Sequence, residues 1–342
     1  MSEALDTFAI MEILEIHDGA LRPATVSTPS PGPGEVLVAV GAAGVNRADL
    51  MQVAGHYPPP PGAPEHPGLE VAGTVAAVGE GVTGWHDGDR VAALLAGGGY
   101  ATHVLVPAGQ LLPIPPGPDG DLTDAQAAAL PEALATVWSN LVGVGDHPVG
   151  GLTTGDTVLI LGGAGGVGSV AVQVAAALGA RVIATASTSK LDVVRELGAA
   201  VVIDHRERDA AGVTQDVLHA TGGRGVDVVL DVLGGGALTE NVRRLATGGR
   251  LVVIGTQQGA RGELDALALM QRRASIHGTT LRARPVAEKA AVVADVVRHL
   301  LPHVTAGRIR PLVHATLPLA DAEQAHAMLR DGHAVGSVVL IP

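Results

Sequence analysis

A glycine-rich run carries the most specific chemistry in this sequence. Gly163, Gly165 and Gly168 fit the spacing G-x-G-x-x-G, after the apolar residues 158–161 and at the start of the helical pattern 167–178. The first glycine of such a run permits a tight turn, the second lets a pyrophosphate approach the backbone, and the third lets helix and strand pack closely. No Lys-Ser or Lys-Thr pair follows, which excludes a Walker-type site. A plain strand-to-helix turn is the alternative, but we favour a dinucleotide site. Its predicted residues are Gly163, Ala164, Gly165, Gly166, Val167 and Gly168.

The end of the next apolar run indicates which dinucleotide binds. An NAD site usually carries an acid there for the ribose 2′-hydroxyl, whereas residues 185–190 are Thr-Ala-Ser-Thr-Ser-Lys and contain no acid. Hydroxyls and a cation suit a 2′-phosphate, so Ser187, Thr188 and Lys190 predict NADPH in preference to NADH. The alternative is that Ser187 caps a helix and Lys190 is solvated.

Six short apolar runs, separated by helical segments, would position these residues. The runs begin 24, 19, 27, 23 and 25 residues apart, about the repeat of parallel strands joined by crossover helices. The sequence therefore predicts a doubly wound α/β domain with a six-stranded parallel sheet. The runs are 158–161, 182–186, 201–203, 228–232, 251–254 and 276–281.

Proline divides the chain into two regions. Of its 22 prolines, 16 lie in residues 1–131, where short strands separated by turns predict a mostly β domain. A predicted helix at 286–303 and a strand at 337–341 form a tail that we expect to return to that domain. We therefore predict one domain from residues 1–131 and 282–342, and a dinucleotide-binding domain at 132–281.

Composition and charge exclude several classes of protein. With 22 Lys and Arg against 34 Asp and Glu, the net charge is −12, which disfavours nucleic-acid binding. The absence of cysteine excludes disulfides, thiolate nucleophiles and cysteine-ligated zinc. Residues 158–180 carry no charge, but their glycines fit a strand, a turn and a helix better than a membrane span. Residues 1–8 lack the features of a secretory signal, so we expect a cytoplasmic protein with no membrane partner.

Eight collinear motifs give the chain a family resemblance. They are residues 46–50 (NRADL), 55–62 (GHYPPPPG), 68–70 (GLE), 88–91 (GDRV), 97–101 (GGGYA), 129–133 (ALPEA), 279–284 (TTLRAR) and 323–326 (EQAH). In these the sequence resembles the zinc-free quinone oxidoreductases of the medium-chain dehydrogenase/reductase superfamily. It is most similar to the group of the tumour-suppressor-inducible NADPH quinone oxidoreductase.

The resemblance implies an architecture and a metal content. Both ends of the chain would form a GroES-like catalytic domain, with a Rossmann domain inserted between them. Members usually form homodimers, often by pairing their sixth Rossmann strands, here residues 275–281. Zinc-dependent relatives hold the metal through Cys, His and Cys, whereas the first two positions here are Asn46 and Leu69. We therefore expect no metal.

The resemblance also implies roles for single residues. Asn46 would lie beside the nicotinamide ribose and Thr136 near the nicotinamide, while Tyr57 would bind or protonate a substrate oxygen. The alternatives are a turn-forming Asn46, a Tyr57 that only packs its loop, and a Thr136 bonded to its own helix. His205 replaces a tyrosine that relatives often place near the 2′-phosphate. The predicted catalytic residues are Asn46 and Tyr57. Asn46, Thr136, His205, Ile254, Gly255 and Leu281 complete the predicted cofactor-binding set.

Departures from the family pattern concern the cofactor. The serine and lysine segment at 187–190 is one residue shorter than in close relatives, and Ser337 replaces a family lysine, so NADPH selectivity is expected to be weaker.

The reaction expected is hydride transfer from NADPH to a quinone or another activated conjugated carbonyl, because such acceptors need no Lewis acid. The alternatives are an enoyl-thioester or alkene reductase of the same superfamily, and a cofactor-binding protein without activity, crystallin-like or RNA-binding.

Overall fold

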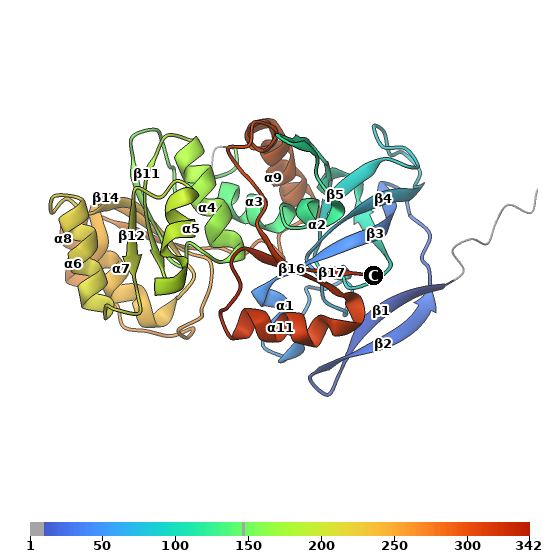
Figure 1. Cartoon of the computed structure of the whole chain (residues 1–342), viewed down its shortest axis with the longest axis horizontal. Helices are drawn as coiled ribbons and strands as arrows, with labels where there is room; N and C mark the ends of the chain where they lie inside the picture. The colour runs from blue at the N-terminus through green and yellow to red at the C-terminus, as the bar shows by residue number, and fades with distance from the viewer. Residues whose placement is uncertain (1–9, 146–147) are drawn as a thin grey trace, which may run out of the picture. The chain divides into compact units, whose positions relative to one another are not determined.

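The computed structural model describes residues 10–145 and 148–342, and the chain forms two compact units (Figure 1). Unit 1 comprises the chain up to Glu132 together with Arg282–Val297 and Pro311–Pro342. Unit 2 comprises Ala133–Leu281 and Arg298–Arg310.

Unit 2 contains a segment that the sequence analysis placed in the first domain, residues 298–310. Two contacts explain its position. The His299 ring stacks on Trp138 at 5.0 Å between centroids, and the Gln173 amide exchanges hydrogen bonds of 3.0 and 2.8 Å with the backbone of Arg310. The helix predicted at 286–303 ends early, at His299, because Pro302 has no N–H to continue its hydrogen bonding and instead lies at the start of a short second helix.

Unit 1 is built on a seven-stranded sheet with the order β16-β17-β3-β4-β5-β7, in which β6 pairs with β3. The last strand of the chain, β17, pairs with β3, which confirms that the tail returns to the N-terminal region. Apolar side chains of β3 and β17 are buried in one core, among them Val36, Val38 and Leu340. The strands are β1 Ile10–His17, β2 Ala20–Ser27, β3 Glu35–Val45, β4 Glu70–Val78, β5 Arg90–Leu94, β6 His103–Pro107, β7 Leu111–Pro113, β8 Pro116–Gly117, β9 Gly120–Asp121, β16 Val313–Pro318 and β17 Ser337–Ile341. The helices are α1 Arg47–Val53, α2 Asp124–Ala127, α9 Val286–His299 and α11 Ala322–Arg330.

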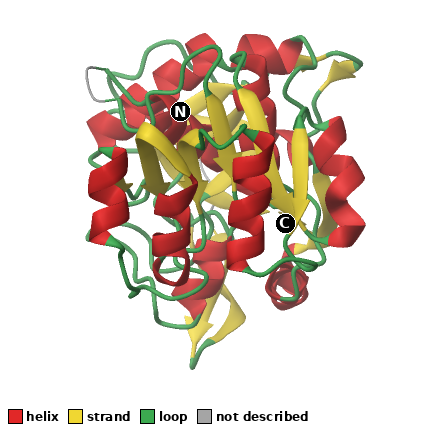
Figure 2. Cartoon of the chain, turned by 90° about the vertical axis from the view of Figure 1, so that its left-hand side faces the viewer, coloured by secondary structure: helices red, strands yellow, loops and turns green. Residues whose placement is uncertain are grey.

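Unit 2 contains a six-stranded sheet whose strand pairs are all parallel, in the order β12-β11-β10-β13-β14-β15. This is the doubly wound order, and it confirms the predicted fold class. One row of the register crosses the sheet through the buried residues Ile183, Leu159, Val229 and Leu251, which pack in one core. Figure 2 shows strands of this unit lying between helices. The strands are β10 Thr157–Ile160, β11 Arg181–Ala186, β12 Val201–Asp204, β13 Val226–Asp231, β14 Leu245–Val253 and β15 Ser275–Gly278. The helices are α3 Pro131–Val137, α4 Gly166–Ala177, α5 Leu191–Glu196, α6 Ala210–Ala220, α7 Leu238–Arg244, α8 Ala266–Arg272 and α10 Leu301–Thr305.

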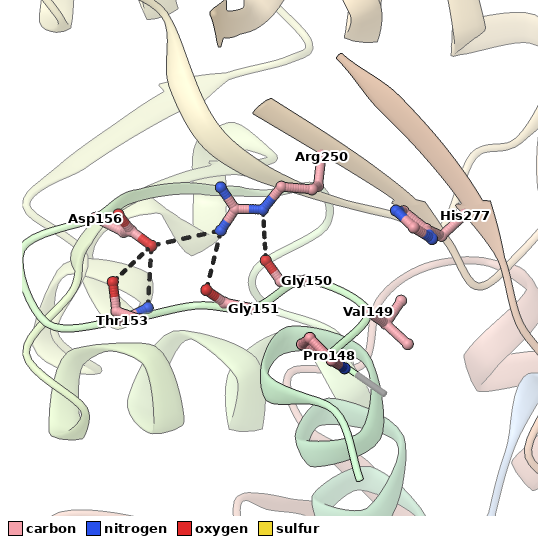
Figure 3. Close-up of a pocket in the computed structure, with 8 residues that line it drawn as sticks. All are labelled: Pro148, Val149, Gly150, Gly151, Thr153, Asp156, Arg250 and His277. Carbon is pink, nitrogen blue, oxygen red and sulfur yellow. Dashed lines mark hydrogen bonds and ion pairs between the residues drawn. The ribbon is translucent and has the colours of Figure 1, made fainter. Parts of the chain in front are cut away.

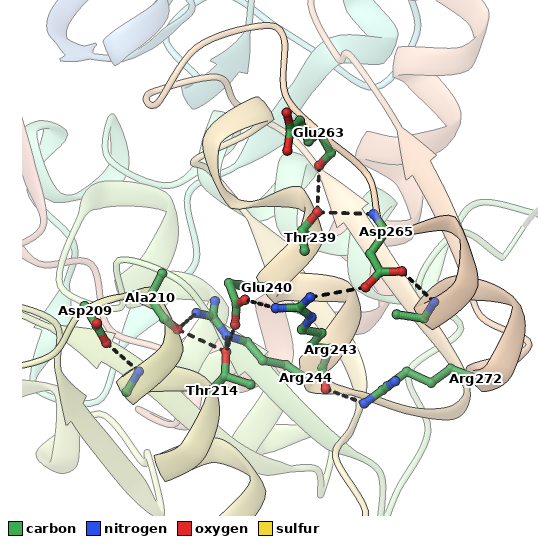
Figure 4. Close-up of polar contacts among 12 residues, drawn as sticks. Asp209, Ala210, Thr214, Thr239, Glu240, Arg243, Arg244, Glu263, Asp265 and Arg272 are labelled. Atoms are coloured by element: carbon green, nitrogen blue, oxygen red, sulfur yellow. Dashed lines mark hydrogen bonds and ion pairs between the residues drawn. The ribbon is translucent and has the colours of Figure 1, made fainter.

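A polar network fixes helices of unit 2 (Figure 4). The buried guanidinium of Arg244, at the end of α7, donates to the Thr214 hydroxyl at 3.0 Å and to the Ala210 carbonyl at 2.8 Å, both on α6. Burial lowers the pKa of Arg244 to about 10. Its neighbour Arg243 pairs with Glu240 and with Asp265 before α8. The network therefore ties together three helices on the sheet.

Two features bear on partners. Among the described strands, β15 pairs only with β14, so it is an edge strand; pairing between two copies of it stays a prediction. Within the described residues, no helix combines the length and apolar character needed to cross a membrane.

Candidate active site

The glycine run lies between β10 and α4 in unit 2. Gly165 caps α4, and a Cβ built on it would find its nearest atom 3.6 Å away, so the space above this helix N-terminus is open. A Cβ on Gly168 would collide with the carbonyl oxygen of Gly162, which explains the close helix packing expected of the third glycine. The tight turn, however, belongs to Gly162, with φ of 73°, and not to Gly163, whose Cβ would press on Ala184 at 2.9 Å. Backbone N–H groups at such a terminus suit a phosphate.

Thr185 anchors this turn, a role that the sequence analysis missed. Its hydroxyl accepts a hydrogen bond from the Gly162 N–H at 3.0 Å, and its carbonyl accepts one from Gly163 at 2.8 Å. Thr185 is the second-to-last residue of β11 and is 5% exposed. The sequence could have indicated this role, because Thr185 carries a hydroxyl near the end of the strand that follows the glycine run.

The predicted 2′-phosphate residues gather at the carboxyl ends of β11 and β12. Ala186 and Asp204 are register partners, so the segments that follow them, with Lys190 and His205, emerge at one edge of the sheet. Burial and the charge of Arg206 lower the pKa of both Lys190 and His205. Three basic side chains therefore lie close enough to influence one another, as a polyanion site requires.

The same corner contains an acid that the sequence analysis did not weigh. The Asp204 carboxylate accepts the Arg206 N–H at 2.8 Å, and the Thr188 hydroxyl beside it lowers the pKa of Asp204. Asp204 is the last residue of β12, and strand pairing places it beside Ala186 at the end of β11. The negative charge of Asp204 opposes the positive charge of the basic cluster. This would weaken the binding of a 2′-phosphate, which agrees with the weaker NADPH selectivity expected from the sequence.

The remaining predicted cofactor residues of unit 2 lie at strand and helix ends. Ile254 and Gly255 directly follow β14, and a Cβ on Gly255 would lie 2.8 Å from the Val232 carbonyl. Thr136 is buried on α3, and its carbonyl accepts the Asn140 amide at 2.8 Å. Leu281 is buried after β15. The ends of β10, β11 and β14 share the carboxyl edge of the parallel sheet, the edge at which such sheets bind ligands.

In unit 1, Asn46 begins α1 and is held by a buried acid. Its side-chain amide donates to Glu70 Oε1 at 2.9 Å, while Glu70 Oε2 accepts the Glu132 N–H, also at 2.9 Å. Gly44 makes room, since a Cβ there would collide with the Glu70 carboxylate. Burial, followed by the charge of Glu132, raises the pKa of Glu70 to about 8. Glu70 therefore fixes the amide of the predicted catalytic Asn46.

A second buried chain of polar groups supports α1. Asp49 Oδ2 accepts the Asn46 N–H at 2.8 Å and lies 3.2 Å from the Tyr100 hydroxyl, which lies 3.0 Å from His326 Nε2. Burial raises the pKa of Asp49 to about 6 and lowers that of His326 to about 4. His326 is therefore neutral at pH 7, and the chain is satisfied when it donates to Tyr100 and Tyr100 donates to Asp49.

Tyr57 is half-buried in unit 1 and stacks against Arg282. The guanidinium carbon lies 5.3 Å from the ring centroid, and Arg282 Nη1 donates to the Tyr57 carbonyl at 3.2 Å. Burial raises the pKa of Tyr57, while the charge of Arg282 lowers it. Asn46 and Tyr57 belong to one unit and the other predicted cofactor residues to the other; each residue's role stays a prediction.

Two further observations concern metals and cavities. Across residues 10–145 and 148–342, no three His, Cys, Asp or Glu side chains are grouped so that they could hold a metal ion. A cavity of about 410 Å³ in unit 2 is lined by residues of 148–156 with Arg250 and His277 (Figure 3). Arg250 there donates to the carbonyls of Gly150 and Gly151 at 2.7 and 3.0 Å. None of the predicted site residues lines this cavity.

Two parts of the chain match known dehydrogenase families. Residues 32–116 match the alcohol dehydrogenase GroES-like domain, and residues 166–296 match the zinc-binding dehydrogenase family. The rat synaptic vesicle membrane protein VAT-1 homolog is 32% identical over 338 residues, 94% of this chain and 80% of that protein. The chain therefore belongs to the medium-chain dehydrogenase/reductase superfamily of oxidoreductases.

Other relatives differ in length and in what their names describe. A mycocerosic acid synthase-like polyketide synthase of Mycobacterium tuberculosis is 35% identical over 315 residues, 91% of this chain, but the match spans only 14% of that protein. A mycobacterial quinone oxidoreductase structure is 34% identical with a TM-score of 0.79, covering 97% of this chain and 100% of its own. A mycobacterial structure complexed with NADPH is 33% identical, with a TM-score of 0.81 and coverage of 98% and 99%. The CurK enoyl reductase is 25% identical, with a TM-score of 0.81 and coverage of 97% and 99%.

Proposed function

We propose that the chain is an NADPH-dependent oxidoreductase that transfers a hydride, without zinc, to a quinone or a similarly activated conjugated carbonyl. The observation that carries this proposal is the environment of Asn46. By the family resemblance, Asn46 stands at the position of the first zinc ligand of metal-dependent relatives, and its amide donates a hydrogen bond to Glu70. With Leu69 at the second position and no cysteine in the chain, the donor set does not fit zinc. An alcohol would therefore lack the group that lowers its pKa, whereas a quinone needs none.

The residues present do fit a phosphorylated dinucleotide. The open backbone at Gly165 and the N-terminus of α4 would hold the pyrophosphate. Lys190 and His205, with the hydroxyls of Ser187 and Thr188, would hold the 2′-phosphate. When bound, NADPH supplies the hydride. By the family resemblance, Thr136 would lie near the nicotinamide and Asn46 beside its ribose, while Ile254, Gly255 and Leu281 would complete the cofactor-binding set.

Tyr57 is the proposed proton donor. As the substrate carbon accepts the hydride, negative charge develops on the conjugated oxygen, and the phenol O–H of Tyr57 can supply the proton that neutralises it. The similar mycobacterial quinone oxidoreductase and NADPH-bound structures support the proposed acceptor and cofactor, whereas the role of Tyr57 rests on the family resemblance.

An enoyl-thioester reductase is the second candidate. The CurK enoyl reductase shares the fold, and the chain also matches one part, 14% of the length, of a polyketide synthase. Both reactions use the same hydride donor and a pocket phenol, so the acceptor has to be measured.

A panel of acceptors separates these functions. With NADPH, we expect fast reduction of ortho- or para-quinones. With NADP+ in its place, we expect no dehydrogenation of simple alcohols, because Asn46 and Leu69 do not fit the zinc that would lower the pKa of an alcohol. The loss or gain of NADPH absorbance measures turnover in each assay. Inactivity toward every quinone, with fast reduction of enoyl thioesters, would favour the second candidate. Binding of NADPH without turnover of any acceptor would favour the non-enzymatic alternative.

Lys190→Ala tests the cofactor assignment. Loss of one charge-assisted phosphate contact costs on the order of 1.5–3 kcal/mol, so NADPH should bind about ten-fold or more weakly and NADH should be almost unaffected. Fluorescence titration gives both dissociation constants. Arg195→Ala is the matched control, because this exposed arginine of the adjoining α5 pairs with Asp192. Equal wild-type affinities for the two cofactors would contradict the assignment.

A further inference from the structure

Arg282 is a buried cation of unit 1 whose side-chain hydrogen bonds within the described chain go to uncharged acceptors. It is 5% exposed, and its nitrogens donate to neutral acceptors: Nε to the Ala96 carbonyl at 2.7 Å, Nη2 to Gln52 Oε1 at 2.7 Å, and Nη1 to the Tyr57 carbonyl. Among the described residues, no carboxylate lies within ion-pair distance of it. Burying a charge without an opposite charge beside it costs free energy of folding. The position of Arg282 is therefore explained best by a function of its guanidinium.

The contacts of Arg282 converge on the loop that carries Tyr57. Nη1 holds the tyrosine's backbone, and the guanidinium carbon lies 5.3 Å from the centre of its ring. Gln52, which accepts from Arg282, donates to the Glu65 carbonyl at 2.6 Å and so holds the same loop further along. One cation thus restrains both the backbone and the ring of the proposed proton donor.

We propose that Arg282 is the positioning residue of Tyr57: it holds the phenol in place and stabilises negative charge on its oxygen when the proton leaves. This inference rests on the proposed function of Tyr57. In the step, the phenol O–H bond breaks and a new O–H bond forms on the substrate oxygen. The two electrons come with the hydride of NADPH, and the phenolate regains a proton from water.

The charged groups around Tyr57 make the direction of this effect clear. Burial raises the pKa of Tyr57 and the charge of Glu132 raises it further, while Arg282 is the group that lowers it. Arg282 itself is influenced by the charge of Asp49, and Lys289 lies beyond it, with Nζ 3.4 Å from the Arg282 carbonyl. Without the guanidinium, burial and the charge of Glu132 would still raise the pKa of Tyr57, and the charge of Arg282 would no longer lower it.

The chain is suited to a spectroscopic test because it has only two tyrosines. Tyr100 is completely buried and its pKa is raised well above the ordinary value, so Tyr57 should ionise first. Phenolate absorbance, read in rapid pH jumps before the protein unfolds, gives the Tyr57 midpoint. Tyr57→Phe should abolish this first transition and thereby assign it.

Arg282→Gln should raise the Tyr57 midpoint by about one pH unit or more and lower kcat for quinone about ten-fold, with a smaller change in KM. Arg90→Gln is the control, because this arginine of unit 1 pairs with Asp124 and has no contact with the Tyr57 loop. A folded Arg282→Gln protein with an unchanged midpoint would overturn the proposal, whatever its activity.

If Arg282→Gln fails to fold, Arg282→Lys takes its place. Lysine keeps the positive charge but lacks the several N–H donors of the guanidinium. The midpoint of Tyr57 ionisation should therefore stay within about half a pH unit of the wild type, while turnover falls. Unchanged turnover in this variant would overturn the positioning role. A raised midpoint in Arg282→Gln, in a protein that reduces no quinone, would leave the electrostatic role standing and refute the proposed function instead.

Discussion

Replacing Glu70 by glutamine should flatten the pH dependence of stability between about pH 5 and pH 8. The pKa of Glu70 is raised from 4.5 to about 8 in the folded protein, mainly by burial. Between these values the folded state keeps a proton that the unfolded state has lost. The stabilisation from this proton is complete below pH 4.5 and is lost as the pH rises toward 8. The wild type should therefore lose on the order of 4 kcal/mol across this range relative to Glu70→Gln.

The two tryptophans allow this loss to be assigned to unit 1. Trp85 lies in unit 1 and Trp138 in unit 2, so urea unfolding followed by fluorescence in a Trp138→Phe background reports the unit that contains Glu70. The Asp49 carboxyl, whose pKa is also raised, is present in both proteins and largely cancels in the comparison. The exposed Glu80 provides a control, Glu80→Gln, which should keep the wild-type slope. Identical slopes for wild type and Glu70→Gln would show that the buried carboxyl does not retain its proton.

The periodic features of the chain were predictable because their physical cause is local. Spacing of 19 to 27 residues between apolar runs requires crossover helices, and the six runs became the six strands of the parallel sheet. The glycine run was equally visible, since strand, turn and helix adjoin in sequence. Even there, the positive φ falls on Gly162, one residue before the predicted motif.

The polar pairs of unit 1 were not predictable because they join distant parts of the chain. Arg282 meets Tyr57 across 225 residues, and Tyr100 meets His326 across 226. Hydrophobic periodicity locates the elements, but it does not determine which polar side chains become buried together. The space for Glu70 depends on Gly44 of the neighbouring strand, which is apparent only once β3 and β4 are paired.

These pairs give unit 1 a common arrangement around its proposed catalytic residues. The side-chain amide of Asn46 donates to Glu70, and its backbone N–H donates to Asp49. Arg282 contacts both the ring and the backbone carbonyl of Tyr57. Restraint of this kind reduces the entropy lost when reacting groups are aligned. A hydride transfer without a metal depends heavily on such alignment, which makes the tyrosine the most informative residue to change.

Tyr57→Phe should lower kcat for quinone reduction by roughly 100-fold and leave KM within a few-fold, because phenylalanine keeps the ring against Arg282 but has no proton to donate. The affinity for NADPH, measured by fluorescence, should be unchanged. Steady-state kinetics across several quinones separates this effect from a change of pocket shape. If Tyr57 only packs its loop, turnover will survive with a modest change in KM, and protonation must then come from water. A kcat that falls while KM and NADPH affinity hold would instead identify the phenol as the group whose proton completes the reaction.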